Sequence, residues 1–343
     1  MNTPNIIIDV HGGDNSPHAP IEGAINALNK ATGFNIILIG KEDVIKQELS
    51  KYTYDKARIQ IVHTLDSVDN TDKPTQVIRE KKDSSMISGL EMLKVQDDCI
   101  AMISTANTGA YLAGGTLIVG RIKGVYRPPL AALLPTLGGN QLCICDAGAN
   151  VDSKPEYINQ YAILASCYMR AFMDIPSPRV GLLNNGTEDT KGSEVVRTTH
   201  QLLKQNEFIN FYGNMEGRNA IEDVVDIIVA DGMLGNVLLK SIEGTAITVF
   251  RMLKNGIMKS GITGKLGALL LKKTFNGIRH TMDYQNVGGA PLLGLNKIVM
   301  KAHGSSKASS ICQSVLDIKK MHDKNMINNI KETIANATNQ QQS

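Results

Sequence analysis

Short apolar runs rich in isoleucine, valine and leucine recur along the chain, and they constrain its fold more than any other feature. Most stretches between them have helical periodicity. A strand that is apolar on consecutive positions must be covered on both faces, and intervening helices supply that cover. The pattern predicts a three-layer α/β/α fold with a mostly parallel sheet, whose strands include residues 6–10, 36–39, 59–62, 100–104, 130–134, 142–145, 180–183, 227–229 and 298–300.

The clearest predicted helix follows Ser153. Its apolar residues, from Ile158 to Phe172, fall on one face at helical spacing. Ser153 and Glu156 have the spacing of a capping box, and Pro155 suits a first helical turn. We therefore expect a long helix that begins close to Ser153.

Composition narrows the possible classes of protein. A net charge of +3 over 343 residues and the lack of a basic stripe interleaved with aromatic residues argue against a nucleic-acid partner. Five scattered cysteines without a C-x-x-C pair indicate reduced thiols. With no signal peptide and no apolar stretch long enough to span a bilayer, we expect a cytoplasmic protein. Residues 1–343 are expected to form one catalytic domain, with a frayed polar tail at about 336–343.

Small polar turns follow the predicted strands, at residues 12–14, 104–109, 146–150, 184–186, 231–236 and 303–306. In an open parallel sheet such turns gather at the carboxyl ends of the strands, where helix N-termini attract anions. Glycines also make ordinary tight turns, and a single loop of this kind decides nothing. Together the turns favour a site for phosphate or another oxyanion.

Several familiar site motifs are missing. The first strand is not followed by G-x-G-x-x-G, and residues 256–265 do not have the P-loop spacing. Neither H-E-x-x-H nor G-x-S-x-G occurs. We expect no metal and no cofactor, and catalysis by positioning and electrostatics without an enzyme nucleophile.

Two basic features near predicted helix starts admit a functional interpretation. Lys191 begins a predicted helix at about 191–204, where a cation opposes the helix dipole. It could hold an anionic substrate group, or Glu188, Asp189 and Glu194 could balance it locally. The predicted helix at 79–86 concentrates cations and hydroxyls, which could serve a phosphate but more often form a solvated face.

Residues 251–282 carry seven Lys or Arg and no acidic residue, among many apolar residues and glycines. This composition predicts a helical hairpin with a basic, apolar tip. Such a tip can lie on an anionic membrane. A helix pair buried in a dimer interface explains the pattern equally well.

Ten motifs, in order along the chain, resemble those of the bacterial phosphate acyltransferases of phospholipid synthesis, the PlsX family. The resemblance covers nearly all of residues 6–310. It departs from the usual family pattern at Val10 and His11, at Ala106 in place of glycine, and at Val287 in place of tyrosine. The motifs occupy residues 9–14, 79–86, 107–110, 127–136, 146–152, 191–194, 213–217, 231–236, 288–294 and 301–306.

The resemblance implies transfer of a long-chain fatty acyl group from acyl-acyl carrier protein to inorganic phosphate, giving acyl phosphate for phospholipid synthesis. It implies an α/β/α fold shared with phosphotransacetylases and isocitrate-type dehydrogenases, in a homodimer. A hairpin at about 236–285 is expected to project and to touch the inner face of the cell membrane through about 256–275. A glycerol-3-phosphate acyltransferase is the expected downstream partner.

Family roles can be assigned only to matching positions. Lys191 and Asn236 are the implied catalytic pair. The candidate substrate and phosphate ligands are Asp9, Gly12, Gly13, Asp14, Lys81, Ser84, Ser85, Asn107, Thr108, Gly109, Asn150, Asp231, Gly232, Gly235, His303 and Ser305.

Two other functions stay open. A short-chain phosphotransacetylase that uses coenzyme A thioesters would follow the same chemistry. A non-catalytic scaffold at the membrane surface would keep the basic hairpin but would not need Lys191.

Overall fold

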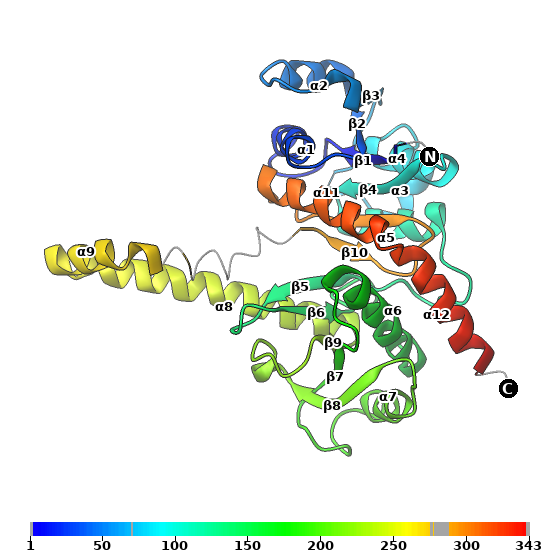
Figure 1. Ribbon diagram of the computed structural model, residues 1–343, viewed down its shortest axis with the longest axis vertical. Helices are drawn as coiled ribbons and strands as arrows, with labels where there is room; N and C mark the ends of the chain where they lie inside the picture. The colour runs from blue at the N-terminus through cyan, green and yellow to red at the C-terminus, as the bar shows by residue number, and fades with distance from the viewer. Residues whose placement is uncertain (1–2, 70, 275–276, 278–287, 341–343) are drawn as a thin grey trace.

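The computed structural model describes residues 3–69, 71–274, 277 and 288–340. Its strands form two sheets, where the sequence predicted one (Figure 1). The first has the order β10-β11-β4-β1-β2-β3, and the second has the order β5-β6-β9-β7-β8. The expectation of mostly parallel pairing is confirmed, because among the strands of the described residues only β5–β6 and β10–β11 pair antiparallel.

All nine predicted runs form strands. The two strands that the apolar pattern missed are β8, whose exposed and covered residues largely alternate at a sheet edge, and the very short β10. The strands are β1 Asn5–Asp9, β2 Asn35–Gly40, β3 Ile59–His63, β4 Cys99–Ser104, β5 Ala131–Pro135, β6 Gln141–Cys145, β7 Arg179–Asn184, β8 Asn210–Glu216, β9 Ile227–Val229, β10 Ala290–Leu292 and β11 Ile298–Lys301.

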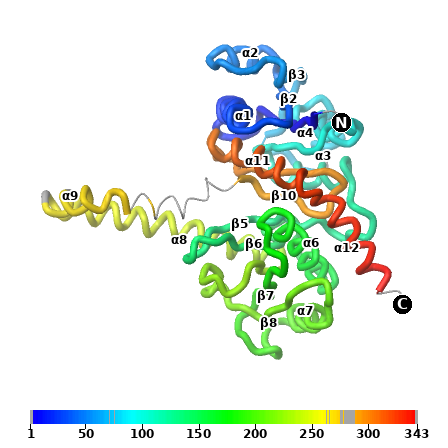
Figure 2. The backbone as a smooth tube through the Cα atoms, viewed as in Figure 1, coloured from blue at the N-terminus to red at the C-terminus, as the bar shows by residue number. Residues whose placement is uncertain are grey.

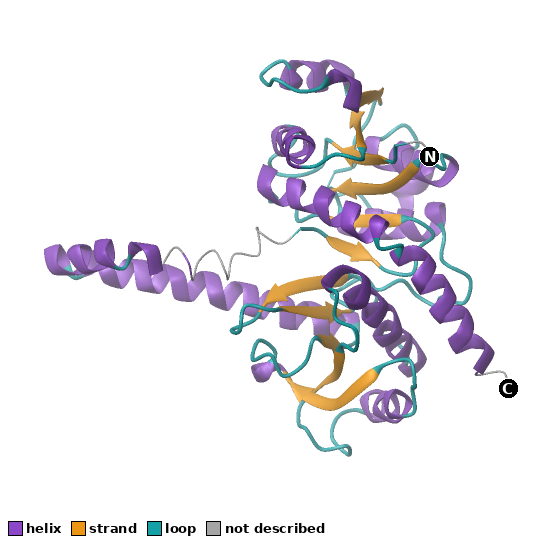
Figure 3. Ribbon diagram, viewed as in Figure 1, coloured by secondary structure: helices purple, strands orange, loops and turns teal. Residues whose placement is uncertain are grey.

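Helices cover both faces of each sheet (Figure 3). In β1, Ile6 and Ile8 pack toward α1 and α11, and Ile7 packs toward α4 on the other face. The expected α/β/α layering is thus present in each sheet. The helices are α1 His18–Lys30, α2 Glu42–Leu49, α3 Pro74–Glu80, α4 Ser85–Val95, α5 Thr108–Gly114, α6 Pro155–Met173, α7 Glu194–Lys204, α8 Gly232–Lys259, α9 Gly261–Leu270, α11 Ala308–Asp323 and α12 Met326–Gln340.

The two sheets are held together by shared packing. α11 lies beside α1, although the two are far apart in sequence (Figure 2). From there α12 continues onto α6 of the second sheet. A bridge between Leu130 and Leu292 joins the sheets directly. Both buried clusters contain residues of both sheets.

Three local predictions were wrong in detail. The N-cap of α6 is Lys154 with no side-chain cap, because Ser153 instead donates its N–H to Asp231 and its hydroxyl lies 3.3 Å from that of Tyr161. The helix expected at 79–86 is broken at residues 81–84. The helix expected from Lys191 begins at Glu194, where the Ser193 hydroxyl accepts a hydrogen bond from the N–H of Val196.

The polar tail also differs from its prediction. α12 continues to Gln340, because Ile330, Ile334 and Ala337 form a buried stripe on it. The helix therefore includes residues 336–340 of the predicted frayed tail. Residues 341–343 lie outside the described part of the chain.

α8 and α9 form a hairpin that projects away from both sheets (Figure 1). Only the first turns of α8 are buried, at Gly232, Gly235 and Leu239. Leu269 and Leu270 on α9 are 65% and 85% exposed. The return of the predicted hairpin, to about residue 285, falls mostly outside the described residues. Val287 lies outside them as well. None of the described helices is both long and apolar enough to cross a membrane.

Candidate active site

A cavity of about 390 Å³ lies between the two sheets. One wall comes from β5, the 146–150 loop and the first turns of α8. The other comes from 288–290, the end of β11 and the 303–306 loop, with Thr108 at the start of α5. The cavity therefore lies where several predicted turns meet, and it brings Thr108, Asn236, His303 and Ser305 together.

The 146–150 loop is built around one carboxylate. Asp146 is fully buried, and its oxygens accept hydrogen bonds from the N–H groups of Leu130, Gly148, Ala149 and Asn150 at 2.7–3.1 Å. The Asn150 side chain adds another bond at 2.8 Å. Burial raises the pKa of Asp146, and these bonds oppose that shift because they favour the charged form. Asn150 thus shapes the loop through its contact with Asp146.

The first turn of α8 fits closely against this loop. Asp231 caps the helix by accepting from the N–H of Met233 at 2.9 Å and from that of Ser153 at 2.7 Å. A β-carbon on Gly232 would lie 2.2 Å from the carbonyl oxygen of Asn150, so only glycine fits there. This contact fixes the turn that carries Asn236 into the cavity lining.

The 303–306 loop forms the opposite wall. His303 Nδ1 lies 2.8 Å from the Ser305 hydroxyl and accepts the Ser305 N–H at 3.2 Å, which places the ring proton of a neutral imidazole on Nε2. Burial lowers the pKa of His303 below its ordinary value. The side chain therefore faces the cavity as a neutral imidazole at neutral pH.

The first motif supports this wall from behind. The N–H of Asp14 donates to the carbonyl of Gly304 at 2.9 Å. Gly13 packs against Thr105, and Gly12, with φ of +87°, packs against Ala106. Ala106 is not among the described residues with positive φ, so it needs no glycine.

Asp9 lies within the first sheet and is 1% exposed. It accepts hydrogen bonds from the hydroxyls of Ser85 at 2.6 Å and Ser104 at 2.8 Å, and from the N–H of His11 at 3.1 Å. Burial raises the pKa of Asp9 and the three bonds oppose the shift. Asp9 and Ser85, two predicted ligands, bind each other.

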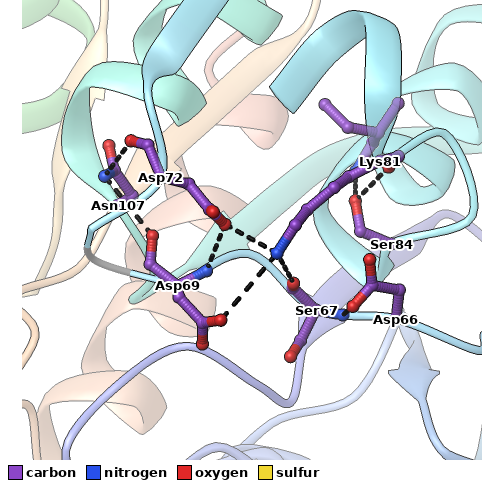
Figure 4. A network of polar contacts seen from close by, with 8 residues as sticks. Asp66, Ser67, Asp69, Asp72, Lys81, Ser84 and Asn107 are labelled. Atoms are coloured by element: carbon purple, nitrogen blue, oxygen red, sulfur yellow. Dashed lines mark hydrogen bonds and ion pairs between the residues drawn. The ribbon is translucent and has the colours of Figure 1, made fainter. Parts of the chain in front are cut away.

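Lys81, Ser84 and Asn107 lie in a second polar network (Figure 4). Lys81 Nζ pairs with Asp72 at 2.8 Å and donates to the carbonyl of Ser67 at 3.0 Å. Ser84 caps α4, while the Asn107 side chain caps α5 and donates to the carbonyl of Asp72 at 3.2 Å. Lys81 and Asn107 thus bind the segment that leads into α3, through Ser67 and Asp72. Gly109 packs against Pro74, the first residue of α3.

Lys191 lies in the loop between β7 and α7. Its main chain is fixed by the Asn184 side chain, which donates to its carbonyl at 3.1 Å, and the side chain is exposed. Lys191 does not line the cavity that contains Asn236. The implied catalytic pair is therefore divided, with Asn236 in the cavity lining and Lys191 in the loop before α7.

Sequence reasoning missed three charged groups of the lining, which are Lys240, Glu243 and Lys301. Lys240 and Glu243 pair at 2.8 Å. Lys301 is only 8% exposed. A cation that directly follows the apolar run 298–300 was the available signal, because a lysine at the end of a buried strand is costly without a ligand. Among the described residues, no group of His, Cys, Asp or Glu has an arrangement that could hold a metal.

Solved structures show the class of fold. The EutD phosphotransacetylase from Staphylococcus aureus matches with a TM-score of 0.59 at 12% identity, covering 94% of each chain. A phosphotransacetylase from Streptococcus pyogenes matches with the same TM-score at 14% identity and the same coverage. The chain is thus an α/β protein with the phosphotransacetylase fold. The expectation of a fold shared with phosphotransacetylases is confirmed.

Sequence relatives define the family. A model described as "Fatty acid synthesis protein" matches residues 5–329. The phosphate acyltransferase of Bacillus subtilis (strain 168) is 41% identical over 329 residues, covering 96% of this chain and 97% of the relative. That of Geobacillus sp. (strain WCH70) is 44% identical over 329 residues, covering 96% and 98%. The chain belongs to this family of phosphate acyltransferases, which confirms the resemblance seen in its motifs.

Proposed function

We propose that this enzyme transfers a long-chain acyl group from acyl-acyl carrier protein to inorganic phosphate. The observation that carries the proposal is the cavity, in which Asn236 at the start of α8 faces the 303–306 loop of the other sheet. A phosphate oxygen attacks the thioester carbonyl carbon, and the carbon–sulfur bond breaks. The hydrogen phosphate proton passes to the departing thiolate, giving acyl phosphate and the free carrier thiol.

Asn236 is proposed to donate from its amide to the oxygen that gains negative charge. Loss of one such donor costs about 2.7–4 kcal/mol of barrier, or roughly a hundred- to thousandfold in rate. Lys191 is proposed to reach the reacting phosphate from its loop and to reduce the repulsion between phosphate and that oxygen. Its exposed side chain beside the hydrogen-bonded main chain supports this role.

Purified Asn236→Ala and Lys191→Ala proteins test the assignment. We expect both to lose most of the phosphate-dependent release of free thiol from palmitoyl-acyl carrier protein. Comparison with acetyl-coenzyme A separates the long-chain reaction from a short-chain phosphotransacetylase. Rates like those of the wild type in both variants would remove the catalytic assignment and favour the scaffold.

We further propose that the enzyme is a homodimer that contacts anionic membranes through the hairpin, on the inner face of the cell membrane. The exposed leucines of α9 and the basic residues around them support membrane contact. The stem of α8, which is exposed along most of its length, offers a face for a second copy. We also propose that the acyl phosphate is delivered to a glycerol-3-phosphate acyltransferase at that membrane.

A further inference from the structure

Lys301 is a buried cation at the edge of the cavity. It is the last residue of β11, where it lies opposite Ser104 in the parallel register with β4. Lys301 belongs to the cavity lining although the residue is only 8% exposed. The Nζ donates to the carbonyl oxygens of Thr105, at 3.3 Å, and of Ala302. Ala302 also lines the cavity, so one of these bonds holds the ammonium group to the main chain of a lining residue.

Among the described residues, no carboxylate oxygen lies within 4.0 Å of the Lys301 Nζ. The charge of Asp9 acts on the Lys301 ammonium through space, without an ion pair between the two. The groups that contact the ammonium are neutral carbonyls, which do not cancel its charge. A buried ammonium without a carboxylate in contact is costly, and an anion in the cavity would offset that cost.

The other charges of the cavity lining leave Lys301 in excess. Lys240 and Glu243 pair with each other at 2.8 Å and cancel. His303 is neutral at neutral pH, because burial lowers its pKa. Burial likewise lowers the pKa of Lys301, to about 8, which still leaves it mostly charged at neutral pH. The lining therefore carries about one net positive charge.

Hydroxyl groups belong to the same cavity lining as this charge. They come from Thr108 and Ser306, whereas the Ser305 hydroxyl is bound to His303 Nδ1. Ser310, in the first turn of the 16-residue helix α11, also lines the cavity and places the positive end of that helix nearby. Hydroxyls, a helix start and one ammonium are the groups that proteins use to hold a phosphate.

We propose that Lys301 is a second cation, besides Lys191, that binds the phosphate substrate, and that its place at the end of β11 defines the phosphate subsite of the cavity. The assignment rests on the proposed function for the identity of the anion. In this proposal Lys301 binds phosphate and does not contact the acyl carrier protein. A change at Lys301 should affect the phosphate KM and leave the carrier KM in place.

The test compares Lys301→Met and Lys301→Arg with Lys297→Met. Lys297 precedes the same strand at its other end, donates to the carbonyls of Gln96, Asp97 and Cys99, and does not line the cavity. We measure thermal unfolding against inorganic phosphate, and the KM for phosphate and for palmitoyl-acyl carrier protein. Lys301→Met should weaken phosphate binding and raise the phosphate KM about tenfold to a hundredfold. Lys301→Arg should recover part of the phosphate binding. Lys297→Met loses its own three hydrogen bonds but should keep the wild-type response to phosphate and the wild-type phosphate KM.

An unchanged phosphate response in a folded Lys301→Met protein would overturn the proposal. If that variant does not fold, trace acetylation of the wild type near the Lys301 pKa of about 8 decides instead. Phosphate should slow the acetylation of Lys301 and leave that of Lys297 unchanged. If Lys301 is acetylated at the same rate with and without phosphate, the subsite assignment is overturned. A wild type that binds phosphate through Lys301 yet forms no acyl phosphate would refute the proposed function alone.

Discussion

Gly235 lies directly against the main-chain carbonyl of Asp146, and a β-carbon on Gly235 would stand 2.0 Å from that oxygen. Asp146 organises the 146–150 loop, and Gly235 precedes Asn236 in the first turn of α8. The contact therefore fixes the position of Asn236 relative to the loop. Small residues at this helix start are a packing requirement of the site.

Gly235→Ala should damage both folding and activity. Either the loop or the helix turn must shift, and such overpacking costs about 1–3 kcal/mol. Gly244→Ala on the same helix is the control, since nothing lies within 4 Å of a β-carbon there. That change should stabilise the helix by about 0.5–1 kcal/mol. Urea unfolding followed by circular dichroism measures the stability of both variants, and the thiol-release assay measures their activity. Equal unfolding midpoints for Gly235→Ala and Gly244→Ala would contradict the packing argument.

Ser104→Ala should destabilise the first sheet by about 1–3 kcal/mol, because the buried Asp9 carboxylate loses a donor. The pKa of Asp9, already raised by burial, should rise further. The folded protein then holds a proton that the unfolded chain releases, so stability falls as pH rises through the window between the two pKa values. Ser88→Ala, whose hydroxyl donates to an exposed carbonyl, is the control. Chemical unfolding over an acidic pH series checks the direction, and a Ser104→Ala profile that matches the control would refute it.

Asp317 should make the protein less stable above mildly acidic pH. Burial raises its pKa from 3.8 to about 6, with the Gln313 amide at 2.7 Å opposing the shift. Stability should therefore fall between these values and level off above them, by about 3 kcal/mol in all. Asp317→Asn should remove this slope, and Gln313→Met should extend it to higher pH. A slope that persists in Asp317→Asn would assign it to other groups.

The leucines of α9 should carry the membrane contact of the hairpin. Leu269 and Leu270 are exposed, and replacing both with glutamate removes apolar contact worth about 1.5–3 kcal/mol per side chain. Sedimentation with anionic vesicles should then fall at least about tenfold. Leu137→Glu, at an exposed leucine outside the hairpin, should leave it unchanged. Unchanged sedimentation of the α9 variant with loss of the dimer would assign this surface to the dimer interface.

The sequence by itself determined the strands other than β8 and β10, and it determined the family. Runs such as 36–39 and 142–145 are apolar on consecutive positions, a pattern that a strand covered on both faces requires. Turns such as 231–236 and 303–306 marked where strands end, and the motifs identified the acyltransferase family. These features are local, so they can be recognised before the chain is folded.

Only the tertiary structure decided how the strands divide into two sheets and which polar residues share a cavity. Lys81 forms an ion pair with Asp72, and the Ser85 hydroxyl donates a hydrogen bond to Asp9. Lys301, by contrast, has no carboxylate partner among the described residues. Lys191 and Asn236 were predicted as one pair, yet only Asn236 lines the cavity. Each outcome depends on contacts between residues far apart in sequence, and a buried charge finds its counter-charge only when the chain has folded.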